Sequence, residues 1–329
     1  MIIVTGGAGF IGSNILAALE ARGENELVVV DRLRDGDKWR NVAKRELMDI
    51  VSPDDVPAFL DHVDPSEVDG IFHMGAISTT TETDADKIIH NNFDLTCRLW
   101  RWCVAHGTRL IYASSAATYG GGEAGFVDDA SIEALAKLQP LNPYGWSKHL
   151  FDRRVARMLE SGEAAPPQWA GLKFFNVYGP NEYHKGGQKS VVAHLFPRAS
   201  EGAPARLFRS HHPDYEDGGQ LRDFVSVDDC VDVMMWLWDN PKVSGLFNCG
   251  TGQCRSFADL ARAVYSALDK PIDLEFVDTP EAIRDKYQYY TQADMTKLRD
   301  AGYDRQFTSL EAGVARYVND FLSKDDPYR

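Results

Sequence analysis

Residues 2–12, Ile2-Ile3-Val4-Thr5-Gly6-Gly7-Ala8-Gly9-Phe10-Ile11-Gly12, decide the fold of this chain. The apolar run before the glycines predicts a buried strand, and the later spacing of Ile11, Ile15 and Leu19 predicts a helix with one apolar face. Glycines between a strand and a helix let the backbone approach a pyrophosphate, which the unpaired N–H groups of the helix N-terminus then bind. The order of strand, glycine turn and helix therefore predicts a dinucleotide-binding turn. Its expected cofactor-binding residues are Gly6, Gly9, Phe10, Ile11 and Gly12.

A second apolar run, Leu27-Val28-Val29-Val30, ends in Asp31, about twenty residues beyond the glycines. A carboxylate at this place suits a ribose hydroxyl and therefore NAD. Arg32, Arg34 and Lys38 follow at once, and such a group of cations suits the 2'-phosphate of NADP. The same cations are also consistent with a solvated basic loop, so the sequence leaves the cofactor open between NAD and NADP.

Two more apolar runs, at residues 69–73 and 109–113, are separated by a stretch with apolar residues at helical spacing. Strands that alternate with helices predict an α/β fold, a Rossmann-type doubly wound parallel sheet. Ligands bind such sheets beyond the carboxyl ends of the strands. Residues 74–76 and 114–115 should therefore line one crevice with the glycine turn, while His73 is interpreted as a hydrogen-bonded histidine at a strand end.

The second half of the chain predicts a smaller mixed α/β substrate-binding lobe, with a strand at 172–175, a strand and turn at 247–252, and helices near 256–268 and 309–323. The turn at 250–252 is interpreted as structural rather than as a second nucleotide site. We expect a nucleotide-binding domain formed by residues 1–175 and 221–249, and a substrate-binding lobe formed by residues 176–220 and 250–329.

Tyr144 and Lys148 lie four residues apart in Tyr144-Gly145-Trp146-Ser147-Lys148, so a helix would place a phenol beside an ammonium on one face. A free tyrosine titrates near ~10, and a neighbouring positive charge favours the phenolate. Tyr144 can therefore act as a general base with Lys148 as its helper. A surface tyrosine and lysine in an ordinary helix would show the same spacing.

Ser114 and Ser115 end the strand that precedes this helix. A hydroxyl at that point could bind a substrate oxygen while Tyr144 removes its proton, and Ser115 is the preferred candidate. Either serine could instead bond local backbone groups, as serines at strand ends often do.

Composition restricts the classes of partner. The chain has 329 residues with 44% hydrophobic content, enough for a sizeable core, and a formal net charge of -14. Such an acidic protein is not expected to bind nucleic acid or an anionic membrane, since both favour a basic surface. Five cysteines without a C-x-x-C motif, and no apolar run approaching ~18 residues, favour reduced thiols and a cytoplasmic protein.

These motifs together resemble the extended short-chain dehydrogenase/reductase superfamily of nucleotide-sugar enzymes, over nearly the whole chain. Within it, residues 112–120, 175–180, 184–186 and 290–294 are most similar to the ADP-L-glycero-D-manno-heptose 6-epimerase family. That resemblance implies a cytoplasmic enzyme that prefers NADP and forms a homo-oligomer, namely a pentamer. It also implies that the enzyme acts on ADP-heptose and supplies heptose for the lipopolysaccharide core.

The resemblance also implies roles for single residues. Lys185, which the sequence alone presents as a solvated lysine, becomes a second catalytic acid/base beside Tyr144, Ser115 and Lys148. Further cofactor contacts are expected from Asp31, Arg32, Lys38, Met74, Gly75, Ala76, Ile77, Ser78, Asn91, Tyr144, Lys148, Val177 and Lys185. Substrate contacts are expected from Ser115, Asn176, Gly187, His194, Phe208, Arg222 and Tyr287, with Arg222 placed to grip a diphosphate.

Three residues depart from the family pattern: Met74 where an acidic residue is frequent, Arg32 where asparagine is frequent, and Gly187 where some members have serine. The first two bear on cofactor contacts and the third on the substrate. None of them removes a catalytic group.

Residues 211–220 predict an exposed loop near the substrate entrance, longer than in similar chains. Its paired histidines, His211 and His212, suggest a metal site, but they lack compact ligand spacing, so no metal is expected.

The resemblance implies that bound NADP+ accepts a hydride from C6 of the heptose, giving a 6-keto intermediate that is reduced on its opposite face. Two proton-transfer groups, Tyr144 and Lys185, would then act on opposite faces. A sugar-nucleotide 4,6-dehydratase is the nearest alternative, but it needs an Asp-Glu pair where this chain has Ala116-Ala117. A catalytically silent NADP-binding regulator is a further alternative, which the intact Ser115, Tyr144 and Lys148 disfavour.

Overall fold

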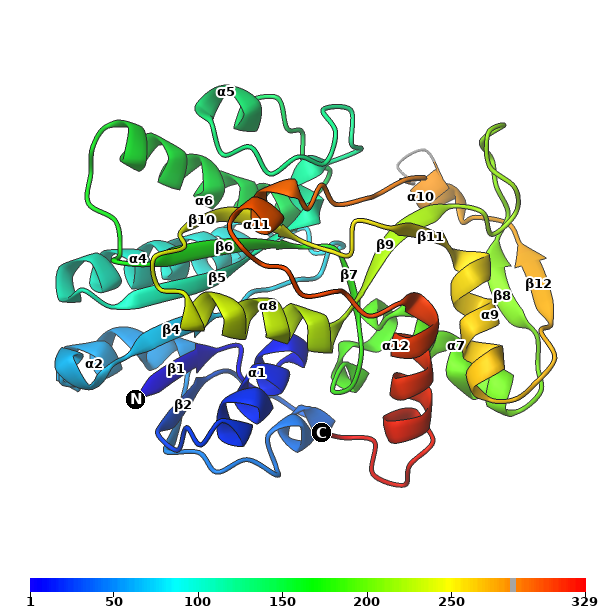
Figure 1. The fold of residues 1–329 in the computed structure, drawn as a ribbon, viewed down its shortest axis with the longest axis horizontal. Helices are drawn as coiled ribbons and strands as arrows, with labels where there is room; N and C mark the ends of the chain where they lie inside the picture. Colours follow the sequence, from blue (N-terminus) through cyan, green and yellow to red (C-terminus); the bar gives the residue numbers. More distant parts are fainter. Residues whose placement is uncertain (285–287) are drawn as a thin grey trace.

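The computed structural model describes residues 1–284 and 288–329, and a seven-stranded parallel sheet forms its larger part (Figure 1). The strand order is β10-β6-β5-β4-β1-β2-β3, so the chain winds outward from β1 in both directions. This is the predicted Rossmann-type sheet. Its strands are β1 (Ile2–Thr5), β2 (Leu27–Val30), β3 (Asp49–Val51), β4 (Gly70–His73), β5 (Arg109–Ser115), β6 (Trp169–Phe174) and β10 (Gly245–Cys249).

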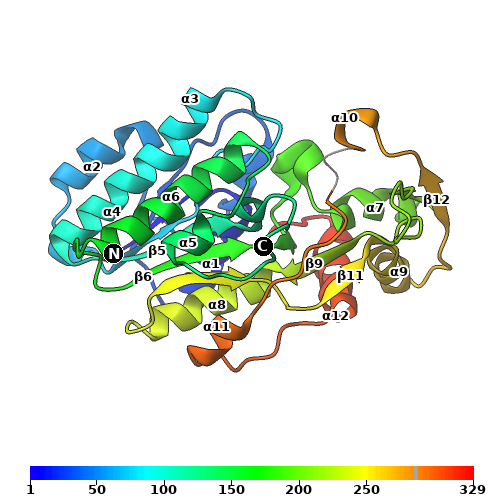
Figure 2. The ribbon, with the colours of Figure 1, turned by 90° about the horizontal axis from the view of Figure 1, so that it is seen from above.

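Helices cover both faces of this sheet (Figure 2). One face packs against α1 (Phe10–Ala21), α8 (Val227–Asp239) and α11 (Thr296–Asp300), and the other against α2 (Val56–His62), α4 (Leu95–His106) and α6 (Pro143–Glu160). Phe72 and Trp238 pack with ring centroids 5.0 Å apart on the first face, and Trp100 and Phe151 at 5.9 Å on the second. Both faces of the strands are therefore buried, which explains their continuous apolar sequences.

Both ends of helix α6 carry residues that commonly begin and end a helix. The side chain of Asn142 accepts a hydrogen bond from the backbone N–H of Gly145 at 2.8 Å, and Pro143 occupies the first helical position. Gly162, with a φ of +75°, follows its end. These signals fix the helix so that Tyr144 lies in its first turn.

A smaller lobe follows the large sheet. It contains a three-stranded sheet, β11-β9-β7, and a two-stranded sheet, β12-β8. Its strands are β7 (Asn176–Tyr178), β8 (Ala205–Phe208), β9 (Leu221–Ser226), β11 (Cys254–Ser256) and β12 (Leu274–Val277), and its main helices are α7 (Val191–Ser200), α9 (Phe257–Ala267) and α12 (Leu310–Tyr317). Three shorter α-helices are α3 (Ala85–Ile88), α5 (Ile132–Leu135) and α10 (Glu281–Arg284).

The segment 221–249, expected in the nucleotide-binding domain, contributes to both parts. Strand β9 pairs with β7 and β11 in the small sheet, whereas α8 and β10 join the large sheet. The chain therefore crosses between the two parts at Ser226, whose side chain accepts from the backbone of Asp228 at the start of α8.

The turn after β10 is structural, as predicted. The buried carboxylate of Asp223 accepts hydrogen bonds from the backbone N–H groups of Thr251, Gly252 and Ala293 at 2.7 to 3.0 Å. Those bonds anchor the turn to β9.

The C-terminal segment returns to the nucleotide-binding part, close to α1 (Figure 1). Lys44 donates to the backbone oxygen of Tyr328 at 2.6 Å, and Arg329 pairs with Asp228 at 2.5 Å. Among the described helices, none has the length and apolar character needed to cross a bilayer.

Candidate active site

The glycine turn between β1 and α1 has the backbone geometry expected of a phosphate cradle. Gly6 has a φ of +65°, and a Cβ there would lie 2.7 Å from the backbone nitrogen of Gly75. A Cβ at Gly12 would lie 2.2 Å from the carbonyl oxygen of Gly6. Only glycine therefore fits at either position, so the first turn of α1 stays open to a ligand phosphate.

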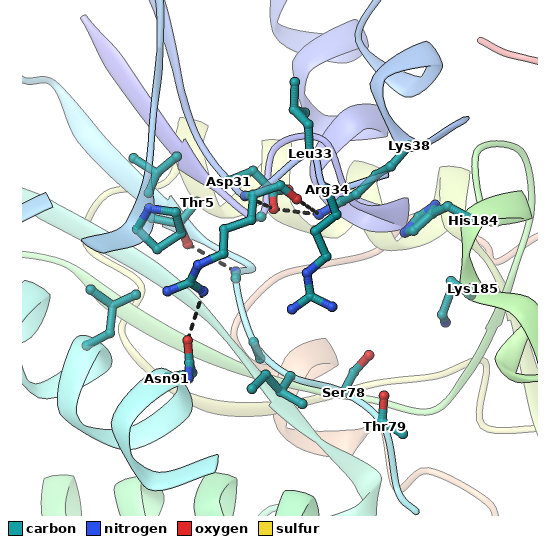
Figure 3. Close-up of a pocket in the computed structure, with 18 of the residues that line it drawn as sticks. Thr5, Asp31, Leu33, Arg34, Lys38, Ser78, Thr79, Asn91, His184 and Lys185 are labelled. Carbon is teal, nitrogen blue, oxygen red and sulfur yellow. Dashed lines mark hydrogen bonds and ion pairs between the residues drawn. The ribbon is translucent and has the colours of Figure 1, made fainter. Parts of the chain in front are cut away.

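A cavity of about 310 Å³ lies beyond the carboxyl ends of β1, β2 and β4 (Figure 3). Many of its residues were predicted to bind the cofactor: Gly6, Asp31, Arg32, Lys38, Gly75, Ala76, Ile77, Ser78, Asn91 and Lys185. Their convergence places the ends of these strands and the start of the glycine turn in one crevice, while Met74 and residues 114–115 line the second cavity described below.

The carboxylate of Asp31 already has hydrogen-bond partners within the protein. Its carboxylate accepts the backbone N–H of Ala8 at 3.0 Å and that of Arg32 at 2.7 Å, and the ammonium of Lys38 lies 2.5 Å from the same group. Lys38 therefore balances the negative charge that would disfavour a 2'-phosphate. The guanidinium of Arg32 is also engaged, with Asn91 at 2.9 Å and Asp54 at 2.6 Å.

Arg34 differs from these two cations. Its side chain points into the cavity, toward the side on which Lys185, Ser78 and Thr79 lie (Figure 3). Within residues 1–284 and 288–329 its guanidinium has no hydrogen bond or ion pair. Its backbone φ is +56°, a left-handed conformation that costs a non-glycine residue stability and is common at functional sites.

A second cavity of about 290 Å³ continues from the first. The two share Gly6, Asp31, Lys38, Gly75, Ala76, Ser78, His184 and Lys185. The second is also lined by the four predicted catalytic residues, Ser115, Tyr144, Lys148 and Lys185, and by Gly9, Phe10, Ile11, Gly12, Met74 and Val177. The nucleotide cradle and the expected chemistry therefore form one continuous space.

Tyr144 and Lys148 both face this second cavity from α6. Burial raises the pKa of Tyr144, while its hydrogen bond with the side chain of Ser115 lowers it. Burial lowers the pKa of Lys148 to about 8, against the attraction of Asp152. Ser115 is therefore hydrogen-bonded to Tyr144, and Lys148 lies one helical turn away on the same face of α6, which is an arrangement suited to proton transfer.

The two serines at the end of β5 have different partners. Ser114 donates to the carboxylate of Asp152 at 2.7 Å, which fixes it in the interior. Ser115 accepts the backbone N–H of Ala117 at 3.1 Å and meets the phenol of Tyr144. The choice of Ser115 over Ser114 agrees with this geometry.

Lys185 comes from the 3-10 turn Tyr183–Gln188 in the smaller lobe. Its ammonium lies 5.3 Å from the centre of the Phe10 ring. Burial lowers the pKa of Lys185, opposed by the nearby carboxylate of Glu182. A partly buried lysine that gives up its proton more readily is suited to acid/base work, unlike the solvated lysine that the sequence alone suggests.

His73 is a bonded interior residue, as predicted. Its ring nitrogens contact Thr5 at 2.6 Å and Thr96 at 2.7 Å. Burial is the main cause that lowers the pKa of His73 to about 3, so the ring is neutral.

Several expected substrate residues do not line either cavity. Asn176 lies 3.5 Å from Thr291, His194 contacts the carbonyl of Gly187 at 3.3 Å, and Phe208 ends β8. Arg222 donates to the backbone oxygens of Leu221 and Gln288. Tyr287 lies outside the described residues.

The loop at 211–220 is partly ordered by its aromatic residues. The rings of His212, Tyr215 and Tyr289 lie 5.1 to 5.4 Å apart, and the Tyr289 hydroxyl accepts from the backbone of His211 at 2.9 Å. No group of three or more potential metal ligands occurs in the described parts of the chain.

Some cavity residues were not predicted, notably Thr79, His184, Gln188 and Phe175, whereas Arg34 was named only as one of the cations that suit a 2'-phosphate. His184 and Gln188 flank Lys185, and Thr79 follows Ser78, so proximity to a predicted residue was the available signal. Phe175 begins the family-like segment 175–180, but an apolar residue at the end of a strand has the pattern of core, so no site role was assigned to it.

A glycine cradle on a Rossmann-type sheet, faced by a Tyr-x-x-x-Lys helix and a strand-end serine, defines a dinucleotide-binding enzyme of the extended short-chain dehydrogenase/reductase type. The NAD dependent epimerase/dehydratase family matches residues 2–250, and the chain belongs to that family.

Individual proteins similar to this chain are more specific than the family model. The chain is 49% identical over 329 residues to the ADP-L-glycero-D-manno-heptose-6-epimerase of Nitratidesulfovibrio vulgaris (strain DP4), covering 100% of both. Its fold is similar to the crystal structure of the Helicobacter pylori ADP-L-glycero-D-manno-heptose-6-epimerase, with a TM-score of 0.78, 25% identity and coverage of 98% and 96%. It is also similar to the UDP-glucose 4-epimerase of Thermus thermophilus in complex with NAD, with a TM-score of 0.75, 25% identity and coverage of 98% and 99%.

Proposed function

We propose that this protein inverts C6 of ADP-D-glycero-D-manno-heptose to give ADP-L-glycero-D-manno-heptose through a transient 6-keto intermediate. The observation that carries the proposal is that one cavity contains two groups able to transfer protons, Tyr144 from α6 and Lys185 from the smaller lobe. The full-length similarity to heptose 6-epimerases supports this choice of substrate. The absence of acidic residues at Ala116 and Ala117 argues against the dehydration chemistry of other members of the family.

The residues of the site fit a dinucleotide. Gly6, Gly9 and Gly12 would hold its pyrophosphate, because a Cβ at Gly6 or Gly12 would collide with the cradle backbone. The rest of the dinucleotide would contact Asn91, Ser78 and residues 74–77. Val177 would lie near its nicotinamide. When bound, the nicotinamide supplies reversible acceptance of a hydride.

The remaining chemistry belongs to the chain. Tyr144, as the phenolate that the ammonium of Lys148 stabilises, takes the proton of the C6 hydroxyl in one epimer and becomes the neutral phenol. Ser115 donates a hydrogen bond to the C6 oxygen. Lys185 performs the proton transfer for the other epimer, whose C6 oxygen lies on the opposite side.

NADP is the proposed cofactor. The carboxylate of Asp31 would favour the unphosphorylated ribose of NAD, but it is already bonded to two backbone N–H groups and to Lys38. Arg34 presents a guanidinium to the same cavity, and guanidinium groups bind phosphate in two-point fashion. Arg32 and Lys38 add positive charge beside it.

Other properties are proposed from the resemblance. We propose that Asn176, Gly187, His194, Phe208, Arg222 and Tyr287 contact the substrate when the lobes bind it, that the protein is a cytoplasmic homo-oligomer, and that its product enters the lipopolysaccharide core. The division into a nucleotide-binding domain and a substrate-binding lobe is kept, with β9 assigned to the lobe.

The proposal is tested by incubating the purified protein, loaded with NADP+, with ADP-D-glycero-D-manno-heptose and separating the two epimers by chromatography. The expected result is an equilibrium mixture of both epimers with no net consumption of cofactor. An unchanged substrate pool, with the Tyr144→Phe variant giving the same trace as the parent, would rule out the function.

A further inference from the structure

A buried ion pair lies close to the proposed catalytic residues Tyr144 and Lys148. Tyr144, Lys148 and Asp152 are four residues apart along α6 and therefore share one face of the helix. The carboxylate of Asp152 lies 3.3 Å from the ammonium of Lys173, which comes from β6. Both of these side chains have 0% exposure, so the pair is fully removed from water.

The same pair is bonded to the turn that carries Ser115. Lys173 donates to the hydroxyl of Thr118 at 2.6 Å, and Thr118 donates to the carbonyl oxygen of Ser115 at 2.8 Å. On the other side, Ser114 donates to Asp152 at 2.7 Å. Asp152 and Lys173 therefore connect the helix bearing Tyr144 and Lys148 to the strand end bearing Ser115.

Stability alone gives little reason for this arrangement. Removing two charges from water costs several kcal/mol per ion, and well-packed apolar residues in place of a buried ion pair are often as stable or more so. A buried carboxylate one helical turn from the proposed catalytic Lys148 has a different explanation, since a charge in a low-dielectric interior acts strongly on its neighbours.

The groups around Lys148 leave Asp152 as its counter-charge. Burial lowers the pKa of His73 on β4 to about 3 and that of His149 on α6 to about 4, so both rings are neutral. Burial also raises the pKa of Tyr112 on β5 and of Tyr119 in the turn after it far above the usual value, so neither is charged.

Two further charged groups lie near Lys173. One is Asp128, whose carboxylate accepts the backbone N–H of Asn248 at 2.7 Å, and the other is Lys297. Among the described residues, the carboxylate that acts on Lys148 is Asp152.

We infer that Asp152 is the counter-charge that keeps the buried Lys148 cationic, and that Lys173 is a positioning residue that holds this carboxylate against the Ser115 turn. This inference deepens the proposed function, because a cationic Lys148 is what makes Tyr144 a usable base. Two lysines share one carboxylate, so Lys173 also limits how strongly Asp152 attracts the proton of Lys148. Removing the carboxylate and removing Lys173 should therefore affect Lys148 in opposite directions.

The test is a pH titration of the Lys148 side chain by NMR, in cofactor-free protein carrying isotopically labelled lysine, with the Lys148 signal assigned by its loss in Lys148→Arg. The parent midpoint is expected near the lowered pKa of about 8. Asp152→Asn should lower this midpoint by about one pH unit, and Lys173→Gln should raise it by a similar amount. Lys173→Arg, which keeps the charge, should leave it at the parent value.

Glu160→Gln at the exposed end of α6 is the matched control for loss of a carboxylate and should not move the midpoint. If Asp152→Asn fails to fold, Asp152→Ser tests the same direction with a smaller side chain. Midpoints that shift in the same direction, or do not shift, in the Asp152 and Lys173 variants would overturn the inference. Because the titration uses no sugar nucleotide, its result is independent of whether the parent epimerises ADP-heptose.

Discussion

At the scale of single residues, the site depends on groups whose proton affinities are changed by burial. Burial raises the pKa of Tyr144 and lowers that of Lys148 and Lys185. A tyrosine in such a place is a poor base by itself, so its use requires the Ser115 hydrogen bond and the Lys148 charge together. The proposed chemistry therefore needs the group of residues rather than Tyr144 alone.

Tyr144→Phe removes the ionisable oxygen and keeps the ring packed against its neighbours. Because general acid–base catalysis by one group typically contributes about 10² to 10⁴ in rate, kcat for epimerisation should fall by that factor while the thermal unfolding midpoint changes little. The measurement is initial-rate epimerisation beside a circular-dichroism melt. A folded variant with near-normal turnover would contradict the assigned role.

Arg34→Ala should weaken NADP binding far more than NAD binding. If the guanidinium makes charge-assisted bonds to the 2'-phosphate, the loss for NADP is ~1 to 3 kcal/mol, and NAD loses little. Calorimetric titration of both cofactors measures the difference. Arg22→Ala is the control, since Arg22 pairs with Asp239 away from the cavity. Equal affinities for the two cofactors in the parent would show that the cavity does not select for the phosphate.

Sequence reasoning at this scale identified the residues that belong to a motif. Gly6, Gly12, Ser115, Tyr144 and Lys148 all line the cavity as predicted. It could not show that Lys38 is paired with Asp31 while Arg34 has no partner among the described residues. Neighbouring cations are equivalent in a sequence, and only the backbone turn decides which one points inward.

At the scale of helices and strands, buried polar residues connect the elements that form the site. His73 joins β1 to α4 through Thr5 and Thr96, and Thr5 also accepts the backbone N–H of Gly75 at 3.0 Å. Since Gly75 lines both cavities, this chain of bonds supports the floor of the cofactor site.

This arrangement predicts a particular dependence of stability on pH. Burial lowers the pKa of His73 to about 3 from 6.5, so below pH 6.5 the unfolded chain binds a proton that the folded chain does not. The contribution of neutral His73 is therefore complete above pH 6.5 and is lost as the pH falls, by about 2 kcal/mol at pH 5.

His73→Gln removes this titration, so its free energy of unfolding should fall less between pH 7 and pH 5 than that of the parent. Urea unfolding at the two pH values measures the difference. His149 and His184, whose pKa values burial lowers to about 4, remain in both proteins and cancel in the comparison. An equal fall in parent and variant would count against a neutral, buried His73.

The periodicity of the sequence predicted the main strands and helices well, because both faces of the large sheet are covered and its strands are continuously apolar. It placed the whole segment 221–249 in one domain. The structure divides that segment after β9, since strand pairing with β7 and β11 is a long-range choice that no local pattern records.

At the scale of the whole molecule, the site lies where the two parts of the chain meet, and the C-terminal segment contacts both. Tyr328 packs edge-on against Tyr183 at 5.1 Å between ring centres, and the hydroxyl of Tyr183 donates to Pro327 at 2.8 Å. Tyr183 begins the turn that carries Lys185. The last residues of the chain therefore help to fix the proposed second base.

Tyr328→Ala should reduce epimerisation several-fold although Tyr328 does not line either cavity, because the turn at 183–188 loses a packing partner. The stability cost should be about 0.5 to 3 kcal/mol, the usual range for a destabilising point mutation. Activity and urea unfolding measure the two effects, with Trp39→Ala, an exposed aromatic, as control. Unchanged activity would show that the turn is held by other contacts.

Tyr144 and Lys185 are proposed to serve opposite faces of C6, and supplying each C6 epimer separately to two variants loaded with NADP+ tests this division of roles. Reduction of the bound cofactor is followed by absorbance. Tyr144→Phe should still reduce its cofactor with one epimer and Lys185→Met with the other, while neither variant should interconvert the two epimers. If both variants keep activity toward the same epimer and lose it toward the same other one, the two-base account is wrong and Lys185 has only a binding role.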